Sequence, residues 1–138
     1  GVGAGQGDSE KSGQGCRITV EGGADVTATG GAGGAGIGGG DGSNGGRSSG
    51  LGKNLVIKGE GTTVNATGGE GAAGIGGGKA GNGYTSGQGY VITVSDGAQV
   101  EATGNGGGAG IGGGNASEDG GLYAGAGHTI PSAARAPT

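Results

Sequence analysis

A glycine-rich heptad that occurs three times is the feature that most limits what this chain can fold into. The heptad Gly-Ala-Gly-Ile-Gly-Gly-Gly occupies residues 34–40 and 108–114, and residues 72–78 differ from it only at Ala72. Self-similarity at a fixed period indicates a repeat architecture, here with a period of about 37 residues. We therefore analyse the chain as a stack of similar units.

A second shared block precedes each heptad and alternates apolar with polar residues. It occupies residues 17–30, 54–68 and 91–104. A period of two predicts β-strands, and the glycines between the alternating stretches predict turns. Each repeat is thus expected to contain three short strands, the third of which is the heptad, followed by a glycine-rich surface loop.

Three strands per repeat, repeated in register, predict an all-β fold: a short parallel β-helix (β-solenoid) of about three 37-residue rungs with glycine-rich loops. Parallel stacking puts equivalent residues about 4.8 Å apart. The expected inward rows are Ile18/Leu55/Ile92, Val20/Ile57/Val94, Val26/Val64/Val100 and Ile37/Ile75/Ile111. The expected outward rows include Glu21/Lys58/Ser95, Asp25/Thr63/Gln99, Thr27/Asn65/Glu101 and Thr29/Thr67/Thr103.

We expect a single repeat domain over residues 1–130 and a tail over residues 131–138. Within the domain we expect a partial rung and loop (1–15), three repeats (16–53, 54–89 and 90–121) and a second partial rung (122–130). Cys16, at a strand start, is expected to be a small buried residue, since free cysteine is usually buried.

The composition fits a thin core. Glycine supplies 47 of the 138 residues, and the aromatic residues are three tyrosines. Collagen is excluded because there are only two prolines and no strict Gly-X-Y period. Glycine also recurs at every third position of the heptad region, so packed polyproline-II strands remain an alternative for that segment.

The Ile-Thr-Val, Val-Thr-Ala-Thr-Gly-Gly and Gly-Ala-Gly-Ile-Gly-Gly-Gly blocks resemble the glycine-rich repeats of microbial surface proteins. Some members of that group are labelled carbohydrate-binding domains and are similar to a right-handed β-helix family that binds acidic polysaccharide. The resemblance covers Gly15 to about Gly114 and implies an extracellular or cell-surface location. It assigns no binding residue.

The sequence argues against an enzyme and against a resident cofactor or metal. No expected outward row stacks two carboxylates, and the lone His128 has no nucleophile–base context. A repeating calcium site is not expected, because Asp41 is replaced by Lys79 and Asn115 in the other repeats. A net charge of −4 with seven Lys and Arg residues disfavours nucleic acid, and no apolar run is long enough for a membrane span.

Two candidate contact sites remain. The first is a flat, outward face on which the heptad glycines allow close approach of a partner. Its expected members are Gly34, Gly36, Gly38, Gly74, Gly76, Gly78, Gly110, Gly112 and Gly114. The second is glycan stacking on Tyr84, Tyr90 and Tyr123, since sugar rings pack on aromatic rings.

Open strand edges at the ends of a short solenoid favour pairing with another copy. His128-Thr129-Ile130 is a possible first strand of a further rung. We therefore predict a non-enzymatic, extracellular structural or adhesive unit that associates head to tail with copies of itself. A carbohydrate-binding module for acidic polysaccharide is the alternative. Ice binding by the threonine row is a distant third, because Asn65 and Glu101 interrupt the neighbouring threonine column.

Overall fold

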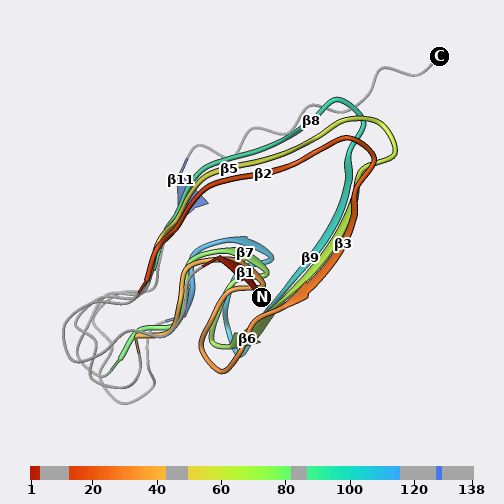
Figure 1. Ribbon diagram of the computed structural model, residues 1–138. Coiled ribbons are helices and arrows are strands. Elements are labelled where there is room, and N and C mark those ends of the chain that lie inside the picture. Colours follow the sequence, from red (N-terminus) through yellow and green to blue (C-terminus); the bar gives the residue numbers. More distant parts are fainter. Residues whose placement is uncertain (4–12, 43–49, 82–86, 116–126, 129–138) are drawn as a thin grey trace.

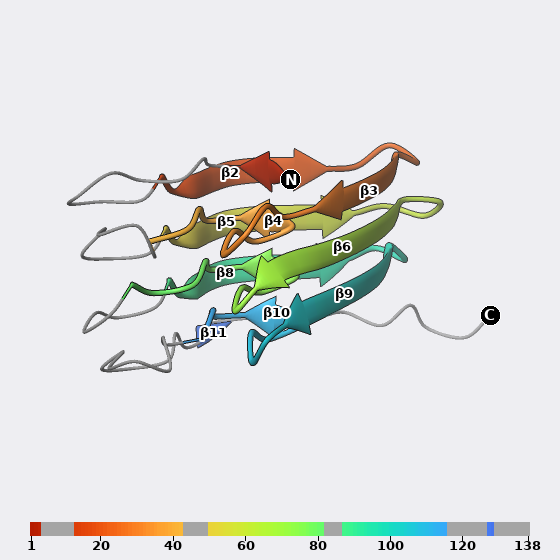
Figure 2. The same cartoon turned by 90° about the horizontal axis from the view of Figure 1, so that it is seen from below.

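The computed structural model describes residues 1–3, 13–42, 50–81, 87–115 and 127–128. Within these ranges the fold is all-β, with parallel strands in three stacked sheets (Figure 1). Each repeat contributes one strand to each sheet, so that a repeat forms one layer of the stack (Figure 2). No helix in the described ranges is long and apolar enough to cross a membrane.

The sheets are named here A, B and C. Sheet A contains β1 (Val2–Gly3), β4 (Ile37–Gly38), β7 (Ile75–Gly76) and β10 (Ile111–Gly112). Sheet B contains β2 (Gly15–Val20), β5 (Gly52–Lys58), β8 (Gly89–Ser95) and β11 (Gly127–His128). Sheet C contains β3 (Asp25–Thr29), β6 (Thr63–Glu70) and β9 (Gln99–Asn105).

The register between layers is the one that the repeat predicts. Ile18 pairs with Leu55 and Leu55 with Ile92 in sheet B, and the valine row of sheet C pairs in the same way. Ile37, Ile75 and Ile111 form the row of sheet A, and Val2 pairs with Ile37 above them. The predicted inward rows are therefore confirmed, and so are the outward rows of sheet C.

The core consists of these rows and is completed by small residues. Ile37, Leu55, Ile57, Ile75 and Ile92 have exposed fractions of 1% or less. Alanines fill the spaces between them, which is why the chain forms a core without Phe, Trp or Met. The middle layer is the most completely enclosed, since it has a layer on either side.

The heptad follows a recurring backbone path. The N–H of Ala35 donates to the carbonyl oxygen of Gly39 at 2.9 Å, and the same bond recurs at Ala73 and Ala109. The N–H of Ile37 donates to Gly74 in the next layer at 3.0 Å. Only the Ile-Gly pair of each heptad forms a strand, which explains why the strands of sheet A are so short.

One residue in each long strand of sheet B has a left-handed backbone conformation. These residues are Arg17, Asn54 and Val91, with φ angles of 54°, 55° and 50°. The register passes over all three without a shift, so no strand gains a residue relative to its neighbour; we call this aligned kink the bulge of sheet B. The bulge reverses the alternation on its N-terminal side, so Cys16 is exposed, and the prediction of a buried Cys16 is wrong.

Thr62 lies at the corner between β5 and β6 and is fully buried. Its hydroxyl donates to the carbonyl oxygen of Lys58 at 2.9 Å and accepts from the N–H of Gly23 at 3.1 Å. This side chain therefore joins the turns of the first and second layers. Thr62 stands at the register position of Ala24 and Ala98, so the residue by which the second repeat exceeds the other two lies earlier in the turn, within residues 59–61.

Candidate functional site

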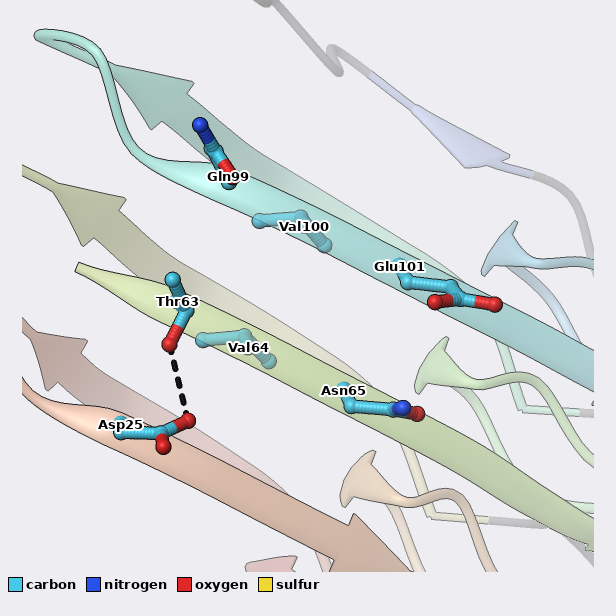
Figure 3. Close-up of a pocket in the computed structure, with 7 residues that line it drawn as sticks. All are labelled: Asp25, Thr63, Val64, Asn65, Gln99, Val100 and Glu101. Carbon is cyan, nitrogen blue, oxygen red and sulfur yellow. Dashed lines mark hydrogen bonds between the residues drawn. The ribbon is translucent and has the colours of Figure 1, made fainter. Parts of the chain in front are cut away.

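The outer face of sheet C carries two rows of polar side chains that follow the stack from layer to layer. Asp25, Thr63 and Gln99 form one row. Thr27, Asn65 and Glu101 form the other. The hydroxyl of Thr63 donates to the carboxylate of Asp25 at 2.8 Å (Figure 3). Both rows lie on regular strands, so their side chains are held at fixed spacings.

A shallow groove of about 310 Å³ runs across these rows. We call it the sheet C groove, and it is lined by Asp25, Thr63, Val64, Asn65, Gln99, Val100 and Glu101 (Figure 3). Its polar groups are two carboxylates, two carboxamides and one hydroxyl, and none of the described residues that line it is cationic. The groove is therefore rich in hydrogen-bond acceptors and carries negative charge.

The two carboxylates of the groove do not form a close pair. Asp25 lies on the first layer and Glu101 on the third, and the two residues belong to different rows. With layers about 4.8 Å apart, the two strands that carry them are about 10 Å apart. The arrangement is suited to binding charged or hydrogen-bonding groups at two separate points.

The outer face of sheet B has the opposite charge. Arg17 and Lys53 are both exposed on it, because the bulge turns Lys53 outward. Lys58 forms an ion pair with Glu21, with 3.0 Å between Nζ and Oε2, so this pair contributes no net charge. Both of its side chains are about half exposed, and such surface pairs add little stability.

The predicted glycine face is not an outer surface. Of its nine members, Gly36, Gly38, Gly74, Gly76, Gly78, Gly112 and Gly114 are buried, and Gly34 and Gly110 are half-buried. The chain's own backbone covers these positions: a Cβ on Gly36 would meet the backbone of Thr67 in sheet C, and one on Gly38 would meet Gly76. Sheet A lies within the space that sheets B and C enclose (Figure 1). The prediction of an exposed glycine interface is thus corrected.

The three candidate tyrosines are not placed equally. Tyr90 lies on β8, half-buried, and pairs in register with Lys53 on β5. Tyr84 and Tyr123 lie outside the described residues. The backbone of His128 pairs with Tyr90 and extends sheet B, as the predicted further strand requires, while the rest of that strand lies outside the described residues.

The position that follows each heptad is a packing position. The side chains of Asp41, Lys79 and Asn115 each lie over a turn glycine, at Gly33, Gly71 and Gly107 respectively. Asn115 also donates to the carbonyl oxygen of Gly106 at 3.0 Å. In the described part of the chain, no group of three or more His, Cys, Asp or Glu residues is arranged to hold a metal ion.

The sequence predicted which residues line the sheet C groove but not that they form one. The two rows follow from the repeat alone. The exposed cations of sheet B, Arg17 and Lys53, were missed because the outward position of Lys53 depends on the left-handed residue. That residue is Arg, Asn or Val in the three repeats and has no constant sequence signal. No protein-family model, no curated protein and no solved structure matches the chain.

Proposed function

We propose that the chain is a short parallel β-solenoid and serves as a non-enzymatic structural or adhesive unit outside the cell, whose copies associate end to end. The observation that carries this proposal is the unequal burial of equivalent core residues. In the middle layer Val64, Ala66 and Ile75 have exposed fractions of 3%, 0% and 0%. In the third layer their partners are only half-buried.

The incomplete layer has the right chemistry for another copy. Val100, Ala102 and Ile111 continue rows whose other members are valine, alanine and isoleucine. A further layer of the same kind would therefore fit onto them in register and bury apolar surface. Among the strands of the described residues, β9 in addition has one hydrogen-bonded neighbour, β6, and unpaired edges favour strand addition.

Two neighbouring substitutions on β9 test this proposal. Ala102→Lys places a charge on the inward row, where the long side chain can reach solvent through an open end but not inside a stack. Thr103→Lys adds the same charge on the outward, exposed side of the same strand. The control thus matches the test in charge, strand and layer.

We expect the unmodified chain and Thr103→Lys to form longer particles as concentration rises, in negative-stain electron microscopy and sedimentation velocity. Ala102→Lys should remain short while keeping the β-sheet circular dichroism spectrum. Compact particles of the unmodified chain at every concentration would refute end-to-end association. So would equal assembly of the two lysine variants.

The alternative function, binding of acidic polysaccharide, is favoured by one observation on sheet B. Tyr90 pairs with Lys53, and Arg17 lies exposed on the same face. An aromatic ring beside a cation suits a sugar that carries a carboxylate. Retention of the chain on a polygalacturonate column, lost in Tyr90→Ala and in Lys53→Gln but kept in Thr93→Ala, would support this function. Retention that is the same for all of these chains would exclude this face as the site.

A further inference from the structure

We infer that the sheet C groove is a lateral docking site for a second copy of this chain, which inserts the cationic side chains of Arg17 and Lys53 from its sheet B face. The inference rests on the proposed structural role, to which it adds a side-by-side contact. It uses different residues from the end-to-end contact, so the two contacts can be tested separately.

The groove has the chemistry that a cationic side chain requires. Asp25 and Glu101 supply carboxylates at opposite corners, and the amide oxygens of Asn65 and Gln99 lie in the same two rows (Figure 3). Asp25 already accepts one hydrogen bond, from Thr63, and a carboxylate has room for further donors. Hydrogen bonds from guanidinium or ammonium groups to carboxylates are stronger than neutral ones.

The sheet B face presents the matching donors. In a regular strand, residues alternate between the two sides, and Lys53 would point into the core with Leu55. The left-handed residue Asn54 removes this constraint, so Lys53 is exposed on the outer face. Arg17 is the left-handed residue of the layer above and is also exposed. The bulge thus places two long cationic side chains on neighbouring layers.

The spacing of the two faces is compatible because both follow the same stack. Arg17 lies on the first layer, as does Asp25. Lys53 lies on the second layer, one layer away from Glu101. The two cations lie one layer apart and the two carboxylates two layers apart. In two copies with parallel stacking axes, one cation therefore faces a carboxylate, and the other must span about 5 Å along the stack, within the reach of flexible Arg and Lys side chains. Because the donating and receiving faces differ, a pair of copies keeps one free face of each kind, and the contact can propagate.

Substitutions that reverse the charges of the two faces test this contact. All of them are made in a background chain that carries Ala102→Lys, which limits end-to-end growth. The first variant adds Arg17→Glu and Lys53→Glu, and the second adds Asp25→Lys and Glu101→Lys. A third variant carries all four changes and restores the original net charge. The matched control reverses the existing ion pair with Glu21→Lys and Lys58→Glu, away from the groove.

We expect the first and second variants to raise the dissociation constant of the lateral complex about tenfold or more in sedimentation equilibrium. These two variants shift the net charge in opposite directions, so a nonspecific charge effect would change association in opposite directions. The third variant and an equimolar mixture of the first two should recover association, and the ion-pair control should leave it unchanged. Circular dichroism verifies that each chain is folded.

Several results would overturn the inference. They are the absence of lateral association in the background chain at millimolar concentration, unchanged association in the first two variants, and failure of the folded third variant to recover. End-to-end association is measured separately, as the particle length of a chain that carries the groove substitutions but retains Ala102. Failure of the proposed function is thereby distinguished from failure of the lateral contact.

Discussion

Exchanging Val and Asn at the left-handed position of sheet B tests whether the fold imposes this backbone conformation. Val91 has a φ of 50° and an exposed fraction of 42%, so its side chain contributes little to the core. A β-branched residue is strongly disfavoured in this conformation, at a cost of roughly 1–2 kcal/mol, whereas asparagine tolerates it. Val91→Asn should therefore raise the free energy of unfolding by about 1 kcal/mol, after allowance for the lost apolar contact.

The same row supplies the opposite change. Asn54 has a φ of 55° and is exposed, so Asn54→Val should lower the free energy of unfolding by about 1 kcal/mol. For a domain of this size each change corresponds to a shift in the melting temperature of roughly 4 °C. Urea and thermal unfolding followed by circular dichroism, at concentrations that keep the copies apart, measure both effects. If neither substitution alters stability, or if both shift it in the same direction, the bulge does not impose the conformation described here.

Two further predictions concern the core. Ile75→Ala should lower the free energy of unfolding by about 4 kcal/mol and Ile111→Ala by about 2 kcal/mol, because the first site is fully buried and the second is only half-buried. Equal losses of unfolding free energy in urea would contradict the unequal enclosure of the layers. Thr62→Val should lower the free energy of unfolding by about 2 kcal/mol and speed amide hydrogen exchange at Gly23, since the hydroxyl that accepts its N–H is removed. Thr62→Ser keeps the hydroxyl and should keep that amide protected; exchange that is the same in both variants would argue against the bond.

The register of the strands could be predicted from the sequence because it depends on the repeat alone. Once Ile18, Leu55 and Ile92 are aligned, the period of two fixes which side of each strand faces the core. The sheet C groove follows from the same alignment. In these regions the alternation of apolar and polar residues determines both the local strand and its packing.

The remaining features depend on contacts between segments that are distant in the sequence. The heptad alternates Ile37 with glycines, which suggests one inner and one outer side. In the structure both sides are covered, because sheets B and C approach sheet A from opposite directions. The bulge at Arg17 was equally hidden, since the left-handed residue is Arg, Asn or Val in the three layers and has no constant sequence signal. Strand alternation cannot reveal either feature.

The closeness of the three sheets explains where the repeats agree and where they differ. A Cβ on Gly15, Gly52 or Gly89 would overlap the backbone of the heptad strand beside it, so these positions require glycine in every layer. Two outward rows of sheet C carry no such requirement, and there the layers differ, as in Asp25, Thr63 and Gln99.

Packing therefore accounts for the repeated residues but not for the charges on the outer faces. Arg17 and Lys53 gather on sheet B, while Asp25 and Glu101 lie on sheet C. A surface that served only to keep the chain in solution would not need to separate the two signs. The separation is instead what a contact between unlike faces of identical copies would require, and the proposed lateral contact would join stacks side by side in addition to the proposed end-to-end contact.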